Sequence, residues 1–170
     1  MSLYIVRDDI TNLKVDAIVN AANERLWEGG GVCGRIFEVA GKNDLSAACR
    51  KIGYCETGDA VLTSGFKLPA KYVIHAVGPI YRNGKFKEDI ILKKTYMSAL
   101  NLAKSKDIKS IAFPLISAGI FAYPKGEAIE IALRSIKEFL SQNDMEVFLV
   151  LFDRETFEIA EKIYNKINGL

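Results

Sequence analysis

The chain has 170 residues, of which 49% are hydrophobic and 26% charged, and its formal net charge is +2. This length matches one domain with a substantial core, and the composition is that of a soluble globular protein. The balanced charge and the scattered lysines argue against a nucleic-acid-binding face. No apolar run has the length of a membrane span, and the first residues lack the charged start and long apolar centre of a signal peptide.

The three cysteines, Cys33, Cys49 and Cys55, are odd in number and form no CxxC pair. We therefore expect neither a disulfide scaffold nor a metal site, and no other cofactor. Reduced cysteines suit the cytoplasm, which is the expected location. No linker or repeat divides residues 1–170, so we expect a single domain and, because one compact domain needs no partner for its core, a monomer.

Strands and helices alternate along the chain. In chain order the pattern predicts strands at 3–9 and 17–19, helices at 32–39 and 44–52, strands at 59–65 and 71–78, a helix at 88–106, a strand at 110–117, a helix at 126–142, a strand at 146–153 and a helix at 154–167. Several strands are apolar throughout, and the connections have helical length. The sequence therefore predicts an α/β fold, with helices on both faces of a largely parallel sheet.

Three unusual loops follow predicted strands, at residues 20–31, 117–121 and 152–155. In α/β sheets, ligands bind in the crevice beyond the carboxyl ends of the strands. These loops are therefore the first candidates for a binding site.

The stretch "NAANERLWEGGGVCGRIFEVAG" holds three consecutive glycines, Gly29, Gly30 and Gly31, before a helix expected to begin near Val32. Glycines let several backbone N–H groups point at one centre, and a helix N-terminus adds a positive potential, so the loop is a candidate anion site. The spacing is neither GxxxxGK[ST] nor GxGxxG. A tight turn that packs the helix on the strand is the alternative explanation.

A second small-residue loop, "SAGIF", begins with Ser117, Ala118 and Gly119 and offers another possible phosphate cradle. Two such loops at one sheet edge would suit a diphosphate. Phe121 and Phe152, at the ends of different strands, are candidate rings for a sugar or a base, with core packing as the alternative.

Asp9 stands at the end of a predicted strand and is a candidate acceptor for an adenine amino group. A solvated or helix-capping aspartate is the alternative. His75, the only histidine, lies within an apolar strand, where a satisfied core histidine is the commoner role than catalysis.

Together these residues resemble the macro domain family, which binds ADP-ribose. The similar blocks are "DDITNLKVDAIVNAANERLWEGGGVCGRIFEVAG", "CETGDAVLTSGFKLPAKYVIHAVGPIY" and "SIAFPLISAGIFAYPKGEAIEIAL", in that order and with fitting separation. The resemblance covers nearly the whole chain. It implies one macro domain over residues 1–170, with a three-layer α/β/α sandwich around a mixed, largely parallel sheet of six or seven strands.

The resemblance also implies a ligand-binding role for individual residues. Asp9 and the backbone at Ile10 match the adenine-recognition pair, and Phe152 matches the ring that packs on the adenine. The two phosphate loops match Gly29, Gly30, Gly31 and Val32, followed by Cys33, and then Ser117, Ala118, Gly119, Ile120 and Phe121, with Phe121 beside the distal ribose. Asn23 matches an asparagine that hydrogen-bonds this ribose, and Asn20 one nearer the strand with a more structural part.

Within the family the sequence looks most like the MacroD-type branch, which includes bacterial proteins and the coronaviral X domain. That branch is associated with removing mono-ADP-ribose from acidic side chains and with deacetylating O-acetyl-ADP-ribose. Both reactions cleave an ester on the distal ribose. The expected partners are therefore ADP-ribose and its derivatives and mono-ADP-ribosylated proteins, and a bacterial source is expected.

One position departs from the branch. Bacterial and human MacroD-type enzymes read GGVDG where this chain reads GGVCG, so Cys33 replaces an aspartate that is a proposed base. Phe37 replaces a histidine that often follows. The coronaviral domains also lack the aspartate and are still regarded as hydrolases. Three interpretations of Cys33 stay open: a small apolar filler, a thiolate base, or a nucleophile with a partner base.

The catalytic candidates are then Asn23 and the backbone at Gly31, with Glu28 and Cys33 as weaker ones. A water between the phosphate and Asn23 would attack, with a substrate phosphate oxygen as the base and the loop amides holding the charge. An exposed loop glutamate is the alternative explanation for Glu28. A non-catalytic ADP-ribose recognition module is the alternative function, because of Cys33.

Overall fold

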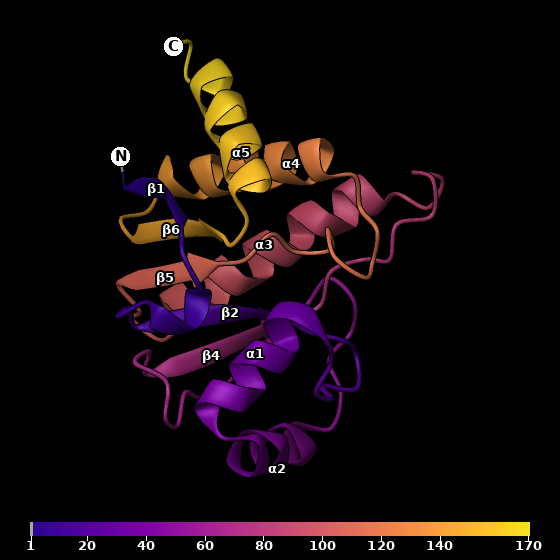
Figure 1. Ribbon diagram of the computed structural model, residues 1–170, viewed down its shortest axis with the longest axis vertical. Helices are drawn as coiled ribbons and strands as arrows, with labels where there is room; N and C mark the ends of the chain where they lie inside the picture. The colour runs from indigo at the N-terminus through magenta and orange to yellow at the C-terminus, as the bar shows by residue number, and fades with distance from the viewer. Residues whose placement is uncertain (1) are drawn as a thin grey trace.

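A mixed sheet of six strands forms the middle layer of the molecule (Figure 1). The structure is a computed structural model that describes residues 2–170. Its elements in chain order are β1 (Leu3–Arg7), the 3-10 helix η1 (Ile10–Asn12), β2 (Ala17–Ala21), α1 (Gly31–Ala40), α2 (Lys42–Ile52), β3 (Ala60–Ser64), β4 (Tyr72–Ala76), α3 (Glu88–Ser105), β5 (Ser110–Phe113), α4 (Lys125–Leu140), β6 (Glu146–Leu151) and α5 (Arg154–Ile167).

The strands lie in the order β1-β6-β5-β2-β4-β3. Every neighbouring pair is parallel except β3 and β4, which pair antiparallel at one edge. Because β2, β4, β5 and β6 run in the same direction, their carboxyl ends meet at one edge of the sheet.

Helices cover both faces of the sheet. On one face α1 and α2 pack over apolar side chains such as Ile18 and Val73, and on the other α3, α4 and α5 pack over Val19 and Ile74. Figure 1 shows α1 and α2 together at the lower end of the molecule and α5 at the upper end. The predicted three-layer α/β/α fold is confirmed, with six strands. None of the helices within residues 2–170 is long and apolar enough to cross a membrane.

The central strands read as continuous apolar runs because both of their faces are covered. Ile18 and Val19, which point to opposite faces of β2, are both fully buried. This explains why the sequence predicted a buried strand here without any alternation of polar and apolar residues.

Most element boundaries differ from the prediction by one to three residues, and the strand predicted at 110–117 is shorter than expected because it ends at Phe113. Two of the differences have clear local reasons. The first strand ends at Arg7, because Asp9 caps the unpredicted helix η1: its Oδ1 accepts hydrogen bonds from the Thr11 N–H (2.9 Å) and the Thr11 hydroxyl (2.6 Å). The second helix begins at Lys42 rather than residue 44, because Gly41, with φ of 104°, lets the chain leave α1 and enter α2 directly.

His75 is part of the core and not of an open site. Its Nδ1 lies 3.1 Å from the Nδ2 of Asn20 on the neighbouring strand, and its Nε2 lies 3.0 Å from the Oγ1 of Thr63. The Thr63 hydroxyl donates to the Ser64 carbonyl, so its oxygen is free to accept from the imidazole. The ring is therefore neutral, with the proton on Nε2, and accepts from Asn20 at Nδ1. The satisfied-core interpretation of this histidine is the one the structure supports.

Burial lowers the pKa of His75 from 6.5 to about 4. Between these two pH values the unfolded chain binds a proton that the folded chain does not. The contribution of the neutral imidazole to the free energy of unfolding is therefore complete above pH 6.5, and it is lost as the pH falls toward 4. Since one pH unit corresponds to about 1.4 kcal/mol, the free energy of unfolding should fall between about pH 7 and about pH 5 by about 2 kcal/mol more in the wild type than in His75→Gln. Urea unfolding at both pH values checks this, and equal pH dependence of the two proteins would contradict it.

Candidate functional site

Two adjoining cavities open at the carboxyl edge of the sheet. The first, of about 270 Å³, is lined by Ala21, Ala22, Asn23, Gly29, Gly30, Gly31, Val32, Cys33, Gly78, Pro114, Leu115, Ile116, Ser117, Gly119, Ile120 and Phe121. The second, of about 400 Å³, is lined by Asp8, Asp9, Ile10, Gly31, Val32, Arg35, Pro114, Val150 and Phe152. They share Gly31, Val32 and Pro114 in their walls, so they lie side by side and together make a depression along this edge. The loops that the sequence singled out are thus brought together.

The glycine loop supplies one wall of the first cavity. The helix α1 begins at Gly31, with φ of 56°, and its N-cap residue Gly30 has no side chain to satisfy the first-turn N–H groups. A Cβ on Gly34 would lie 2.6 Å from the Gly29 carbonyl oxygen, so the loop folds tightly back on the helix. The unpartnered N–H groups and the positive end of the helix dipole therefore face the cavity, as an anion site requires.

The loop after β5 supplies the facing wall. Ser117 has a positive φ of 68°, and its backbone carbonyl accepts from the Tyr123 N–H (2.9 Å), which closes the loop. A Cβ on Gly30 would lie 3.7 Å from the Cδ1 of Ile120, so the tips of the two loops approach each other over the cavity. The Oγ of Ser117 is buried and has no partner among residues 2–170.

Asn23 reaches the first cavity from the end of β2. Its Nδ2 donates to the Trp27 carbonyl (2.9 Å), and its Oδ1 accepts from the Trp27 N–H (3.0 Å). These two bonds fix the orientation of the amide and leave one N–H and one lone pair for a ligand. Asn20 does not line either cavity, because it lies beneath the loop and is bonded to His75.

The second cavity lies between η1, α1 and the end of β6. Phe152 is 73% exposed and lines this cavity, so the core-packing alternative for it is wrong. Asp9 has the helix-capping role that the sequence left open, and its Oδ2 also pairs with the guanidinium of Arg35 at 2.9 Å. Partial burial by itself would raise the pKa of Asp9, but the hydrogen bonds from Thr11 and Arg35 outweigh it and lower the pKa. Asp9 is therefore an ionised acceptor at the cavity wall.

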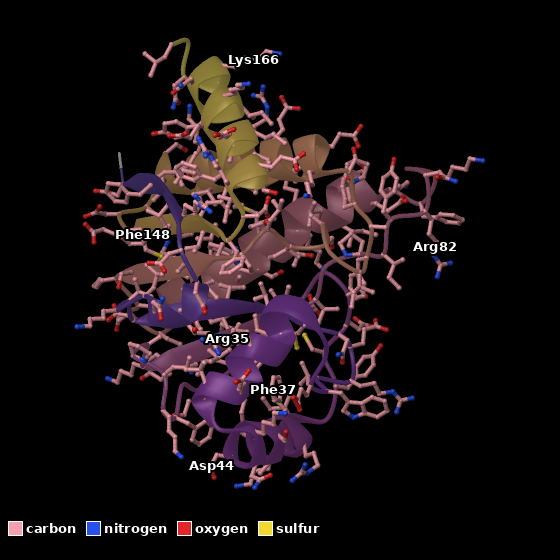
Figure 2. The ribbon with its side chains drawn as sticks, in the orientation of Figure 1. Arg35, Phe37, Asp44, Arg82, Phe148 and Lys166 are labelled. Atoms are coloured by element: carbon pink, nitrogen blue, oxygen red, sulfur yellow. The ribbon has the colours of Figure 1, made fainter. Side chains whose placement is uncertain are left out.

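Two side chains of α1 illustrate how the helix serves both the site and the core. Figure 2 shows Arg35 and Phe37 leaving the helix on different sides. Arg35 is exposed and lines the second cavity, whereas Phe37 is buried among the apolar residues under α1 and α2. Phe37, which replaces the branch's histidine, thus contributes packing.

Cys33 lies in the wall of the first cavity and is buried. Its Sγ is 3.7 Å from the Trp27 carbonyl oxygen, and burial raises the pKa of the thiol. The ring nitrogens of His75 are occupied by Asn20, Thr63 and, at 3.9 Å, Cys49. A neutral thiol without a partner base favours the filler interpretation.

Glu28 is exposed at the loop tip and forms an ion pair with Lys42 at 3.3 Å. It lines neither cavity, which agrees with the exposed-loop alternative. Ala118 also stays outside the cavity walls, because it packs against the core. Residues 2–170 contain no group of three or more His, Cys, Asp and Glu side chains that could hold a metal ion.

Sequence reasoning missed several residues of the cavity walls, among them Gly78, Pro114 and Arg35. Gly78 follows β4 and Pro114 follows β5, so their position after parallel strands was a usable signal. Arg35 lies one turn into α1, and its pairing with Asp9 depends on the tertiary fold.

Comparison with known proteins agrees with this geometry. The Macro domain profile matches residues 19–132. The chain belongs to the macro domain family. It is 41% identical over 171 residues to a protein of Escherichia fergusonii named O-acetyl-ADP-ribose deacetylase, which covers 97% of this chain and 94% of that protein. The macrodomain of Trypanosoma brucei in complex with ADP-ribose superposes with a TM-score of 0.88 at 38% identity, over 96% of this chain and 69% of that one.

A mouse protein named ADP-ribose glycohydrolase MACROD2 is 52% identical over 169 residues. The match covers 98% of this chain but 34% of the mouse protein, so the chain spans about a third of the length of that relative. The likeness to these relatives supports the MacroD-type branch that the sequence blocks indicated.

Gly78 offers a test of how closely the site loops approach. A Cβ at this position would lie 2.3 Å from the Ser117 Oγ and 2.5 Å from the Ile116 Cγ2, whereas one at Gly126 would meet nothing within 4 Å. We predict that Gly78→Ala lowers the free energy of unfolding by about 1–3 kcal/mol, because the overpacked loop must shift. Gly126→Ala, in the first turn of α4, should leave it equal or up to about 1 kcal/mol higher. Urea unfolding of both variants gives the comparison, and equal stability of the two would contradict the close approach.

Proposed function

We propose that this macro domain binds ADP-ribose and hydrolyses the ester at its distal ribose, in mono-ADP-ribosylated acidic side chains or in O-acetyl-ADP-ribose. The observation that carries the proposal is this depression of two adjoining cavities. An exposed aromatic ring and an aspartate stand at one end, two amide-rich loops face each other at the middle, and an asparagine stands at the other end. The order of these groups along the two cavities matches the order of adenine, diphosphate and distal ribose in ADP-ribose.

In this proposal the adenine occupies the second cavity, with its amino group on Asp9 and its ring on Phe152. The diphosphate lies where the cavities meet, over the N–H groups at Gly31 and Val32 and opposite the loop that begins at Ser117. Backbone donors suit this role because they are fixed in place and need no basic side chain.

The distal ribose then lies in the first cavity beside Asn23 and Phe121. A water held between Asn23 and the diphosphate would attack the carbonyl carbon of the ester, and a phosphate oxygen of the substrate would accept its proton. The bond from that carbon to the ribose oxygen would then break, and the ribose oxygen would take the proton from the phosphate and leave as a hydroxyl, with the acid released as its carboxylate. The N–H groups around Gly31 would stabilise the negative charge that develops. Catalysis of this kind depends on positioning and on fixed dipoles, so it requires no charged base from the protein.

The relatives support the proposal through the activities that their names carry. The mouse relative is named a glycohydrolase of ADP-ribose, the Escherichia fergusonii relative a deacetylase of O-acetyl-ADP-ribose, and the Trypanosoma brucei macrodomain was solved with ADP-ribose. We propose mono-ADP-ribosylated proteins as the macromolecular partners, because the depression is open at the surface where a carrier protein would approach.

Asn23 provides the first test of turnover. Because Asn23 lines the first cavity and its amide is held by the Trp27 backbone, Asn23→Ala should lower the rate of ester hydrolysis about 100-fold through loss of the positioned water and ribose. The measurement is release of label from a carrier automodified on glutamate or aspartate. Asn165→Ala, at an exposed position on α5, serves as the control. An unchanged rate in Asn23→Ala would refute its assigned role.

A recognition module without chemistry is the second candidate, and Cys33 is the observation that favours it. If the enzyme releases no label at high concentration while it still binds ADP-ribose, recognition is the function. If it does release label, Cys33→Ser and Cys33→Ala should keep the rate within about twofold, because a buried neutral thiol supplies neither base nor nucleophile. A large loss in both variants would instead assign chemistry to the thiol.

A further inference from the structure

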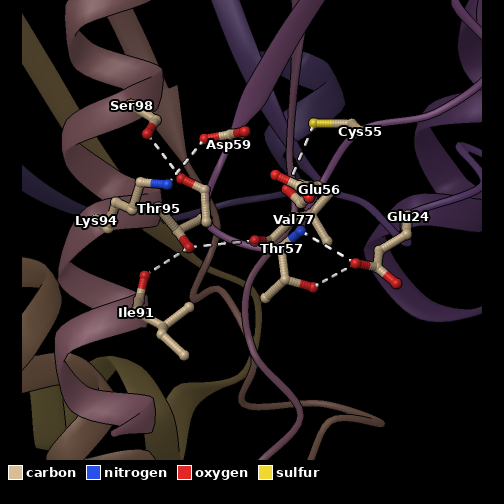
Figure 3. Close-up of polar contacts among 11 residues, drawn as sticks. Glu24, Cys55, Glu56, Thr57, Asp59, Val77, Ile91, Lys94, Thr95 and Ser98 are labelled. Atoms are coloured by element: carbon tan, nitrogen blue, oxygen red, sulfur yellow. Dashed lines mark hydrogen bonds and ion pairs between the residues drawn. The ribbon is translucent and has the colours of Figure 1, made fainter.

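The residue that follows Asn23 is tied to a different part of the chain. The Oε2 of Glu24 accepts hydrogen bonds from the Thr57 N–H (3.2 Å) and the Thr57 hydroxyl (3.0 Å). The backbone carbonyl of Glu24 accepts from the Cys55 N–H at 2.9 Å. Figure 3 shows the carboxylate facing Thr57. The hydrogen bonds from Thr57 lower the pKa of Glu24, so these are bonds to an ionised acceptor, which are stronger than neutral ones.

Residues 55–59, which include the donors to Glu24, are themselves hydrogen-bonded to other parts of the domain. The Ser98 hydroxyl on α3 donates to the Gly58 carbonyl (2.7 Å), and the Gly58 N–H donates to the Val77 carbonyl (2.7 Å). Lys94, also on α3, pairs with Asp59 at 3.1 Å. In Figure 3 Ser98 and Lys94 lie on one side of Thr57, and Glu24 lies on the other. Glu24 is therefore hydrogen-bonded to a segment that α3 and the end of β4 hold in place.

Asn23 lies between two attachments. On its N-terminal side the Ala22 N–H donates to the Ala76 carbonyl at the end of β4 (2.9 Å). On its C-terminal side stands Glu24, followed by a turn in which the Leu26 N–H donates to the Asn23 carbonyl (3.0 Å). The backbone on both sides of Asn23 is thus held in place, which sets where its side chain enters the cavity.

We propose that Glu24 is a positioning residue for Asn23, and that its carboxylate, through Thr57, sets the contact between Asn23 and the distal ribose of the ligand. The inference rests on the proposed ADP-ribose function. In that proposal the adenine lies against η1 and the end of β6, and the diphosphate lies at the start of α1 opposite the loop after β5. Asn23 is the proposed ligand contact nearest to Glu24 in the chain, so loss of Glu24 should weaken the distal-ribose contact more than the others. This selectivity separates positioning from a general structural role.

A conservative variant of Glu24 can keep its hydrogen bonds from Thr57 and so tests whether these bonds matter. Both Thr57 donors use the same oxygen of Glu24, so the single carbonyl oxygen of a glutamine can accept both. Glu24→Gln should therefore preserve the contact, and Glu24→Ala should remove it. Asp59→Ala is the control. It removes a carboxylate from the same segment, residues 55–59, but this carboxylate contacts Lys94 and not Glu24.

The experiment measures the affinities of ADP-ribose and ADP by calorimetry, since ADP lacks the distal ribose. In the wild type, ADP-ribose should bind more tightly than ADP. Glu24→Ala should reduce this preference about 3- to 10-fold, the effect of one weakened hydrogen bond, while the affinity for ADP stays unchanged. Glu24→Gln and Asp59→Ala should keep the wild-type preference.

Three outcomes would overturn the positioning role and leave the proposed function standing. The first is an unchanged preference in Glu24→Ala. The second is an equal weakening of ADP and ADP-ribose binding in Glu24→Ala, and the third is a loss of preference of the same size in Asp59→Ala; both would indicate general loosening of the fold. If wild-type protein binds neither ligand, or binds ADP-ribose no better than ADP, the proposed distal-ribose site itself fails and the positioning role falls with it.

Discussion

The parallel pairing of β2 with β4 and β5 is the constraint on which the site depends. It places the carboxyl ends of these strands at one edge, so that the loops after them share one space. The glycine loop after β2, Gly78 after β4 and the loop after β5 each contribute to the first cavity. β6, also parallel, adds Phe152 at the adjoining cavity. The site is thus made by strand direction and not by any single motif.

The site is electrostatically favourable to anions without an unpaired basic side chain in its first cavity. Gly30 leaves the first-turn N–H groups of α1 uncapped, and the helix dipole adds to their partial charge. Arg35, which lines the second cavity, is paired there with Asp9. Backbone donors therefore hold the phosphates in our proposal, while the ion pair keeps an ionised carboxylate beside the base.

Beneath the loops, buried polar groups connect the site to the core. Asn20 and His75 pair across β2 and β4, and Asn23 and Glu24 continue the same strand into the loop. Glu24 then joins the loop to a segment held by α3. Each of these contacts pairs polar groups whose burial without a partner would cost free energy. Together the contacts hold the loop in one preferred position. Precise placement of Asn23 is a consequence of this chain of contacts.

The sequence by itself determined the order of elements, the mixed α/β class and the loops that form the site, because these depend on periodicity, glycine clusters and family blocks within short stretches. Tertiary structure alone decided the partners of individual residues. Asn20 and His75 are 55 positions apart, Glu24 and Thr57 are 33 apart, and Asp9 and Arg35 are 26 apart. Such pairs depend on which strands become neighbours and in what register. For the same reason no pattern in the sequence singled out Glu24, and only the packing of residues 55–59 beside the Asn23 loop gave its carboxylate a fixed partner.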